Sequence, residues 1–250
     1  MGKEMNYGYI PRNFEEVPVV EGIEKSVLQP IRRADWRELI ELKKKNKANI
    51  SDIMTRKKIP LIIQNSYGYC HSAGCVNSMM TTRALANKET VHLSLSSIAG
   101  PITGYRDVGM PIYAALKRAI SFGAAPVDLY PEATTKNFWT KEVEVAAAKY
   151  KVEEWTELET YKGSQSKAQA EHVFDLVATS LLLGFPVVVG LMWWGHCVMY
   201  ANLDFVNGVY VIDGINSWGP QYRDNGILPG WFRFAEGKAT PYEAYSIRTI

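Results

Sequence analysis

Cys70 is the first residue in this 250-residue chain with a suggestive chemical setting, because it stands just before a stretch with helical periodicity. The first turn of a helix presents backbone N–H groups and a partial positive charge, and both stabilise a thiolate relative to a thiol. A histidine imidazolium nearby can make the thiolate the major form, and His196 is the candidate partner. The pattern predicts an activated nucleophile, although free cysteines are more often small core residues.

Asn216 and His196 are expected to lie at one end of a sheet, because a predicted β-hairpin brings both residues there. The pair Asn207-Gly208 predicts a two-residue type I′ turn between two strands. Strict pairing across that turn puts Asn216 opposite Met199, which lies three residues from His196, or about 10 Å along a strand. A bulge or longer excursion near residues 202–204 would have to remove this offset.

A set of short motifs resembles those of the papain-like cysteine peptidases. The family order of glutamine, cysteine, histidine and asparagine is found here as Gln64, Cys70, His196 and Asn216. Further runs that match the family pattern are Asn216-Ser217-Trp218-Gly219, Gly109-Met110-Pro111, Tyr130-Pro131 and Asn225-Gly226. The resemblance covers roughly residues 58–230, and the combined set of motifs is specific although no single motif is.

The resemblance implies a role for each matching residue. Cys70 would be the nucleophile, and His196 would form a thiolate–imidazolium pair with it and later protonate the leaving amine. Asn216 would fix the orientation of the imidazole, and Trp218 would shield their hydrogen bond from water. The Gln64 amide and the Cys70 backbone N–H would form the oxyanion hole. The residues expected to contact substrate are Gly68, Tyr69, Gly109, Met110, Pro111, Trp194 and Gly195.

Several residues near the nucleophile depart from the family pattern. Tyr67 replaces a cysteine that is normally disulfide-bonded, while Tyr69 and His71 replace a small residue and a tryptophan. His71 is either a second base or a helix residue directed along a different face. Gly195 stands where many relatives carry a side chain that contacts the substrate, so the resemblance leaves the subsite preference open.

The elements that must position these residues form a helix-rich half followed by a strand-rich half. Apolar periodicity predicts helices at residues 34–45, 72–86, 111–121, 140–148 and 167–183. Strands are expected at residues 187–189, 198–205 and 209–212. With the resemblance, this layout predicts an α+β papain-like domain of two lobes. The N-terminal lobe would be helical, the C-terminal lobe would be antiparallel and β-barrel-like, and the active-site cleft would lie between them.

Two parts are expected along the chain: an N-terminal arm and helix at residues 1–57, and the peptidase-like domain at residues 58–250. The first part is shorter than the usual pro-domain of the family. It either lies in the cleft or anchors the domain to a protein partner. A run of basic residues at 43–58 is either a docking patch for an acidic partner or nucleic acid, or a solvated helix end and loop.

The composition excludes several classes of protein. Hydrophobic residues make up 47% and charged residues 22%, as in ordinary globular proteins, and the net charge of +2 makes nucleic-acid binding unlikely as a general property. Three cysteines cannot build a disulfide framework. The uncharged stretch 176–203 is interrupted by Gly184 and Pro186, which predicts a buried helix and strand rather than a membrane span. The absence of a signal sequence predicts a cytoplasmic protein, or alternatively one packaged in a virion.

Neither a metal nor a cofactor is expected, because the spacing of Cys70, His71, Cys75, His196 and Cys197 makes a poor zinc site. The favoured function is a cysteine-type endopeptidase that acts on peptide or protein substrates. One alternative is a related Cys-His amidase that cleaves peptidoglycan cross-links or isopeptide bonds. The other is a non-catalytic domain of the same fold, serving as a structural or binding component of a larger assembly such as a phage or virus particle.

Overall fold

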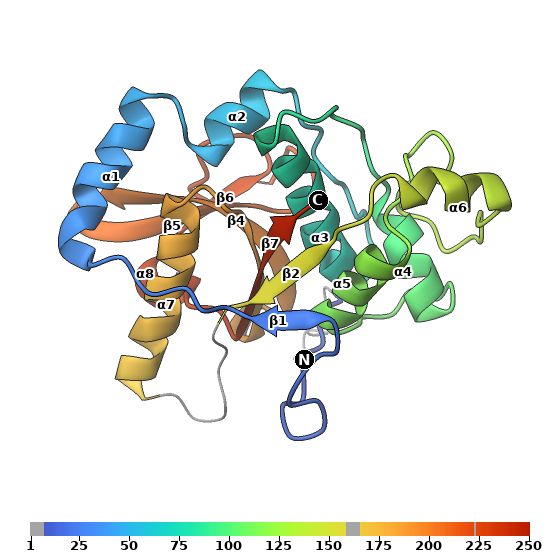
Figure 1. The fold of residues 1–250 in the computed structure, drawn as a ribbon, viewed down its shortest axis with the longest axis horizontal. Coiled ribbons are helices and arrows are strands. Elements are labelled where there is room, and N and C mark those ends of the chain that lie inside the picture. Colours follow the sequence, from blue (N-terminus) through green and yellow to red (C-terminus); the bar gives the residue numbers. More distant parts are fainter. Residues whose placement is uncertain (1–7, 159–165, 223) are drawn as a thin grey trace.

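A computed structural model describes residues 8–158, 166–222 and 224–250, and Figure 1 shows its helical side beside a sheet. The helices are α1 (Arg33–Lys45), α2 (Ile50–Arg56), α3 (Cys70–Leu85), α4 (Leu95–Thr103), α5 (Ile112–Ser121), α6 (Lys141–Ala148), α7 (Lys167–Leu182) and α8 (Glu236–Ala239). The strands are β1 (Ile23–Lys25), β2 (Glu154–Glu157), β3 (Val187–Leu191), β4 (His196–Val206), β5 (Val209–Ile215), β6 (Trp231–Ala235) and β7 (Glu243–Thr249). A short 3₁₀ turn covers Met192–Trp194. The α+β class expected from the sequence is confirmed.

The seven strands form one sheet in the order β1-β2-β7-β3-β4-β5-β6. Only the β1–β2 pair is parallel among these neighbours, and the other pairs are antiparallel. All five residues of β3 are buried, since both faces of this central strand are covered and α3 and α7 both pack against it. Strands buried on both faces read as continuous apolar runs, which explains the sequence Val187-Val188-Val189.

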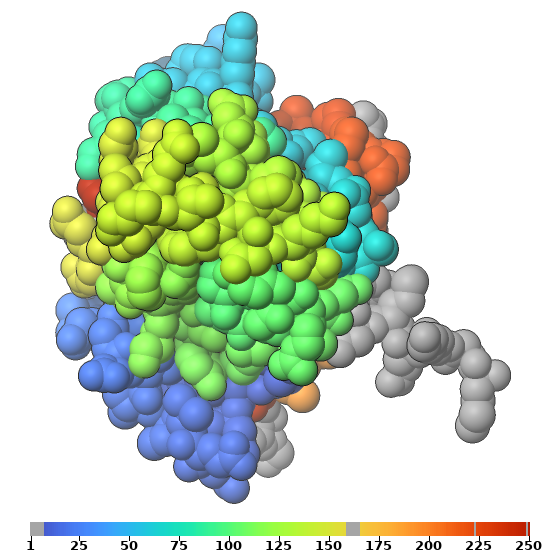
Figure 2. All heavy atoms as spheres, turned by 90° about the vertical axis from the view of Figure 1, so that its right-hand side faces the viewer, coloured from blue at the N-terminus to red at the C-terminus, as the bar shows by residue number. Residues whose placement is uncertain are grey.

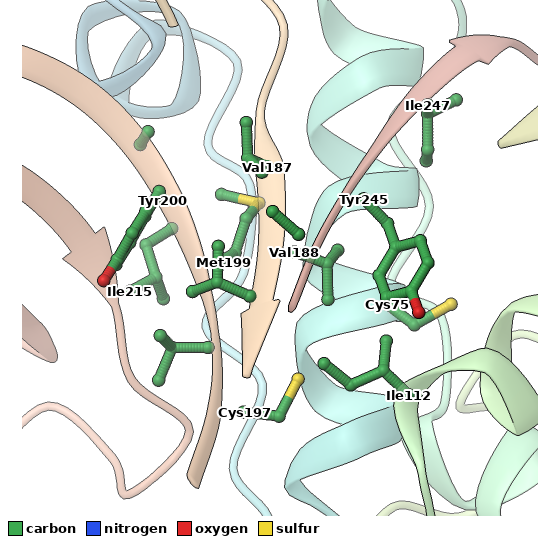
Figure 3. Packing of buried hydrophobic residues seen from close by; sticks show 14 of the residues in the cluster. Cys75, Ile112, Val187, Val188, Cys197, Met199, Tyr200, Ile215, Tyr245 and Ile247 are labelled. Carbon is green, nitrogen blue, oxygen red and sulfur yellow. The ribbon is translucent and has the colours of Figure 1, made fainter. Parts of the chain in front are cut away.

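Helix α3 is the central helix of the molecule, and thirteen of its sixteen residues are buried. It packs against β3, β4 and β7 on one side and against α4 and α5 on the other. Because α3 is covered on both sides, it has no continuous polar face of the kind that an amphipathic surface helix shows. Figure 3 shows its contact with the sheet, where Cys197 and Val188 lie on the side of the strands that faces the helix.

The helix boundaries follow ordinary capping chemistry. Thr140 and Ser166 each accept a hydrogen bond from the backbone N–H three residues later, which starts α6 and α7. Three helices were not expected from the sequence, α2, α4 and the short α8. Helix α4 contains Pro101, which interrupts the helical signal, but its side chains are largely buried. No described helix is long and apolar enough to cross a membrane, and the stretch 176–203 is the end of α7, β3 and part of β4.

Part of the basic run is used within the molecule. Lys43 Nζ donates to the carbonyl oxygens of Leu181 and Leu182 at 3.0 and 3.2 Å, where it caps the C-terminal end of α7. Lys44 pairs with Asp204 of β4 at 2.6 Å. These two lysines therefore fasten α1 to α7 and β4.

The N-terminal arm, residues 8–22, crosses the helical side and then joins the sheet through β1. Strand β1 pairs with β2, with Ile23 opposite Trp155. Figure 2 shows the dark-blue atoms of the arm lying directly against the green atoms of the helical region. The arm is anchored on the domain through its buried residues Gly8, Tyr9, Arg12 and Val20, while the residues between them are largely exposed.

Candidate active site

Cys70 is the first residue of α3, at the end of a loop that the strand side of the molecule holds in place. The backbone N–H of Gln64 donates to the Ser217 carbonyl at 2.8 Å, and the Ser217 hydroxyl donates to Gln64 Oε1. The Gln64 side-chain nitrogen donates to the Tyr67 carbonyl at 2.7 Å. These bonds tie the loop before Cys70 to the segment that follows β5. They also direct the Gln64 amide into the turn that leads to the nucleophile.

The thiol of Cys70 lies against the start of β4. Its Sγ accepts a hydrogen bond from the backbone N–H of Cys197 at 3.4 Å, and Cys197 directly follows His196 in the chain. Residues 70 and 196 are therefore brought together across the interface between α3 and the sheet, although 126 residues separate them in the sequence, as 196 − 70 shows.

His196 and Asn216 form the hydrogen bond expected from the sequence, with His196 Nε2 and Asn216 Oδ1 2.9 Å apart. The side-chain oxygen can only accept, so Nε2 carries the proton and Nδ1 is the accepting nitrogen of the neutral ring. The Asn207-Gly208 turn is present, with φ of 52° and 85°. The register shifts by one residue between Tyr200 and Asn202, slightly earlier than the expected bulge, which brings Asn216 closer to His196.

Two tryptophans lie against the His196 ring. The Trp218 ring centroid is 4.7 Å away at an interplanar angle of 30°, and the Trp194 centroid is 4.9 Å away at 72°. The two indoles also contact each other at 5.3 Å. Trp194 thus lies on the imidazole side of the site, where it belongs to an aromatic cluster with Phe232 and Phe234. Both indoles therefore cover the imidazole that bonds Asn216, and the shielding role expected of Trp218 stays a prediction.

The arm occupies the surface on which Gly68, Gly109 and Met110 were expected to bind substrate. The Met110 N–H donates to the Gly8 carbonyl at 3.1 Å, and the Ile10 N–H donates to the Met110 carbonyl at 3.4 Å. A Cβ added at Gly8, where φ is +101°, would lie 1.9 Å from the Gly68 carbonyl oxygen. A Cβ at Gly109 would lie 2.7 Å from the Gly8 carbonyl oxygen. We call this three-way backbone approach of Gly8, Gly68 and Gly109 the glycine contact.

The residues that depart from the family pattern lie at the same place. His71 Nδ1 donates to the Gly8 carbonyl at 3.3 Å, so its ring faces the arm. The Tyr69 hydroxyl donates to the Arg106 carbonyl at 3.1 Å, and its ring stacks on Tyr67. Asp107, which sequence reasoning did not single out, accepts the Gly68 N–H at 2.7 Å. Of the two alternatives for His71, this geometry favours the helix residue on a different face.

Burial dominates the electrostatics of the covered site. Cys70 and His196 are both fully buried. Burial raises the pKa of Cys70 to about 12, against the smaller opposing effect of the Cys197 and His71 backbone N–H groups. Burial also lowers the pKa of His196 to about 4, against the effect of the Asn216 hydrogen bond. The covered site therefore favours a neutral thiol and a neutral imidazole, because the loss of water outweighs the helix N-terminus.

Pro111 precedes α5 as its N-cap residue, and Gly195 links the 3₁₀ turn to β4. Sequence reasoning missed Tyr9, Glu243 and Gly190, which form a buried cluster beside the site that is described below. No motif marks them, because their proximity depends on the path of the arm. The described residues include no group of three or more His, Cys, Asp or Glu side chains that could hold a metal ion.

Comparisons with known proteins bear on the fold. No protein-family model matches the sequence, and no curated protein matches it. The structure is similar to xylellain, a cysteine protease from Xylella fastidiosa, with a TM-score of 0.66 and 15% identity over 99% of this chain and 97% of that one. It is also similar to procathepsin L 3 of Tenebrio molitor, with a TM-score of 0.66 and 14% identity over 98% of this chain and 77% of that one. A third similar structure is procathepsin B S9 from Trypanosoma congolense, with a TM-score of 0.58 and 10% identity over 95% of this chain and 89% of that one. The fold is therefore papain-like over nearly the whole chain.

Proposed function

We propose that the chain is a cysteine peptidase that cleaves peptide bonds through Cys70 and His196, and that its own N-terminal arm covers the site. The observation that carries the proposal is the arrangement of Cys70 Sγ on the β4 backbone beside His196, which Asn216 orients at 2.9 Å. A scaffold has no need of these side chains together. Their geometry fits nucleophile, base and orienting group.

In the proposed reaction, His196 Nδ1 takes the proton of the Cys70 thiol, and the thiolate attacks the carbonyl carbon of the peptide bond. The negative charge moves to the carbonyl oxygen, where the Cys70 backbone N–H and the Gln64 amide donate hydrogen bonds. When the carbon–nitrogen bond breaks, His196 gives its proton to the leaving amine and an acyl-enzyme remains. His196 then takes a proton from water, whose oxygen attacks the thioester and releases the acid and the Cys70 thiol.

The arm prevents this chemistry in the described structure. Both backbone hydrogen-bonding groups of Met110 are used by Gly8 and Ile10, so a substrate strand cannot pair there. Complete burial of Cys70 in this state raises its pKa and keeps the thiol protonated. Undocking the arm would admit both substrate and water, and water would allow the helix N-terminus and His196 to stabilise the thiolate.

The test is iodoacetamide alkylation as a function of pH, with the modified cysteine located by mass spectrometry. It is carried out on the native chain and on Gly8→Ala, which disrupts the glycine contact. We expect slow labelling of native Cys70. In Gly8→Ala we expect fast labelling that persists below pH 7, is lost in His196→Ala and coincides with cleavage of a casein substrate. Labelling of the Gly8→Ala variant that rises only near pH 8.5 would mean an ordinary thiol.

Complete burial of Cys70 also favours a second candidate, a non-catalytic domain of the same fold that serves as a component of an assembly. That function predicts an ordinary thiol in every variant and no turnover of any peptide. The alkylation profile therefore separates the two functions. An amidase would show the activated thiolate without peptide cleavage, and a panel of peptidoglycan and isopeptide substrates would identify it.

A further inference from the structure

Cys197 is a second buried thiol beside the candidate nucleophile, and the proposed reaction makes no use of it. It directly follows His196 in β4, and its backbone N–H donates to Cys70 Sγ at 3.4 Å. Its side chain is fully buried and is directed from β4 toward α3, as Figure 3 shows. A Cβ added at Gly74 would lie 3.0 Å from Cys197 Sγ. Because Gly74 comes one helical turn after Cys70, the Cys197 sulfur lies against the face of α3 that carries Cys70.

These contacts place the two thiols within reach of a disulfide bond. Since a cysteine sulfur lies within about 4 Å of its own backbone nitrogen, the Cys197 sulfur is less than about 8 Å from Cys70 Sγ. The two Cα atoms are limited in the same way to about 8 Å, and the angles at sulfur and nitrogen shorten this path toward the roughly 4.4–6.8 Å that disulfides usually span. Rotation of either side chain about χ1 moves its sulfur by about 3 Å, so the pair can close with little change in the backbone.

The third cysteine, Cys75, lies on another face of the same helix. It is also fully buried, but its sulfur contacts Met79 Sδ at 3.9 Å and the Ala115 carbonyl oxygen of α5 at 4.0 Å. Its thiol therefore faces α5, whereas Cys70 faces the start of β4. Of the three cysteines, Cys70 and Cys197 are the two that the fold brings together.

The docked arm lies beside the same pair. Gly190 of β3 is paired with Cys197, and a Cβ added at Gly190 would come within 2.2 Å of the Tyr9 ring. Tyr9 is only 3% exposed, and its hydroxyl donates to Glu243 Oε1 at 2.7 Å. We therefore expect an oxidant in solution to reach the pair more readily when the arm undocks.

We infer that Cys70 and Cys197 are a redox pair that forms a reversible disulfide, with Cys197 as the resolving thiol for a nucleophile oxidised by a peroxide. The inference rests on the proposed function for the reactivity of Cys70 toward peroxide. A resolving thiol protects the nucleophile, because a sulfenic acid that meets a second thiol becomes a disulfide, while one that meets more peroxide becomes a sulfinic acid irreversibly.

The chemistry proceeds in two steps. The Cys70 thiolate attacks one oxygen of hydrogen peroxide, the O–O bond breaks, and His196 gives its proton to the departing hydroxide, which leaves as water. The Cys197 thiol then attacks the sulfur of the Cys70 sulfenic acid, and the S–O bond breaks as the S–S bond forms. The departing hydroxide takes the Cys197 proton and leaves as a second water. Over both steps one peroxide is reduced to two waters, and two thiols are oxidised to one disulfide.

The test counts free thiols after oxidation, in the native chain and in Gly8→Ala, whose arm is expected to undock. Each protein is treated with hydrogen peroxide, denatured and alkylated with N-ethylmaleimide, and its intact mass is recorded. We expect the three free cysteines to fall to one, and dithiothreitol to restore all three. The cross-link should form about 10-fold faster in Gly8→Ala, because it needs a locally opened state.

Two variants assign the bond. Cys75→Ala, the matched control, leaves Cys70 and Cys197 as the only cysteines, so its count should fall from two to none. Cys197→Ala should form no internal cross-link and should instead gain two oxygen atoms at Cys70, which dithiothreitol does not remove. A cross-link that persists in Cys197→Ala, or that Cys75→Ala abolishes, would overturn the inference. If a variant does not fold, fragmentation of cross-linked peptides from the native chain makes the same assignment.

Diamide separates this inference from the proposed function, because it converts neighbouring ordinary thiols to a disulfide. A Cys70–Cys197 cross-link with diamide but not with peroxide, together with an ordinary alkylation profile of Cys70, would overturn the activated nucleophile and keep the pair. An activated Cys70 that forms no cross-link with either reagent and becomes a sulfinic acid in the native chain would overturn the pair and keep the peptidase. An ordinary thiol that forms no cross-link would overturn both.

Discussion

Two networks of polar groups, each built on a buried carboxylate, differ in whether one side of the network can separate from the other. In the cleft network, Tyr9 and Arg12 come from the arm, while Glu157, Glu243 and Tyr245 belong to β2 and β7. The contacts that join the two sides include those from Tyr9 to Glu243 at 2.7 Å and from Arg12 to Glu157 and Tyr245 at 3.2 Å.

The body network lies wholly within helices and strands of the domain. Arg233 of β6 pairs with Asp213 of β5 at 2.7 Å and with Asp204 of β4 at 3.2 Å, and Lys44 of α1 adds a contact to Asp204. Asp213 is only 2% exposed. These partners cannot separate unless the sheet itself opens.

The comparison shows that similar chemistry has different consequences in the two regions. A carboxylate that loses its partner in the body network stays buried and carries the full penalty of an unpaired charge. In the cleft network the arm can undock, and water then reaches Glu157 and Glu243. The cost of an unpaired carboxylate in the cleft network therefore cannot exceed the free energy with which the arm docks. The body network therefore stabilises the fold, and the cleft network sets how often the site opens.

The largest effect is expected in the body network. Asp213→Ala should lower the free energy of unfolding by about 3 kcal/mol, because Arg233 loses its main buried partner. Chemical denaturation measures this change. Asp224→Ala, which removes a more exposed pair with Lys238, should cost less than about 1 kcal/mol. The comparison breaks down if Asp213→Ala also accelerates alkylation of Cys70 in the folded protein.

The next effect concerns the glycine contact. Gly8→Ala should raise the alkylation rate of Cys70 by about 10-fold or more, since the new Cβ cannot fit against Gly68 and the arm must undock. Gly22→Ala is the matched control, because Gly22 also has a positive φ in the arm but a Cβ there meets nothing within 4 Å. Equal rates in the two variants would show that loss of backbone freedom, not the clash, is responsible.

A smaller effect should follow removal of one hydroxyl group. Tyr9→Phe keeps the ring over Gly190 and removes the donor to Glu243, so docking should weaken by about 1 kcal/mol, or fivefold in the alkylation rate of Cys70. The free energy of unfolding of the body should stay the same within error in denaturation. Slower alkylation than in the native chain would contradict the role given to this hydrogen bond.

The smallest effect comes from acid. Burial lowers the pKa of His71, whose Nδ1 donates to the Gly8 carbonyl of the arm, to about 4 from an ordinary value near 6.5, so the docked arm favours the neutral form of His71. The contribution of His71 to docking is complete above pH 6.5 and is lost as the pH falls toward 4. Lowering the pH from 7 to 6 should increase opening of the arm about threefold. Hydrogen exchange of an arm peptide relative to an α1 peptide, corrected for intrinsic rates, measures this. Greater protection of the arm at pH 6 than at pH 7 would mean that acid favours docking, which would contradict this prediction.

Local signals in the sequence predict the elements that carry the candidate site. Asn207-Gly208 predicts the hairpin because its residues tolerate positive φ. No sequence signal marks the bulge near Tyr200, which moves Asn216 one residue closer to His196 than strict pairing would. Helical periodicity predicts a helix from residue 72, and α3 begins two residues earlier, at Cys70. The roles of these residues in catalysis stay predictions.

The arm shows what the sequence could not reveal. The glycine contact joins residue 8 to residues 68 and 109 through backbone atoms, and no side-chain pattern marks such an approach. The pKa values of Cys70 and His196 depend on their complete burial, so a helix start alone predicts the wrong charge state for the site as described. Helix α4 was missed for a different reason, because burial compensates for Pro101 within it.

The short pairing of β1 with β2 makes opening of the site different from release of the arm. Strand β1 remains paired with β2 when Tyr9 undocks, so the undocked segment stays attached to the domain close to the site. A short flexible tether keeps its end at an effective concentration in the millimolar range. A substrate must compete with that concentration, and a single cut between Arg12 and Ile23 would abolish it. Proteolysis of this connection would therefore turn an intramolecular competitor into a dilute peptide without changing any contact in the cleft.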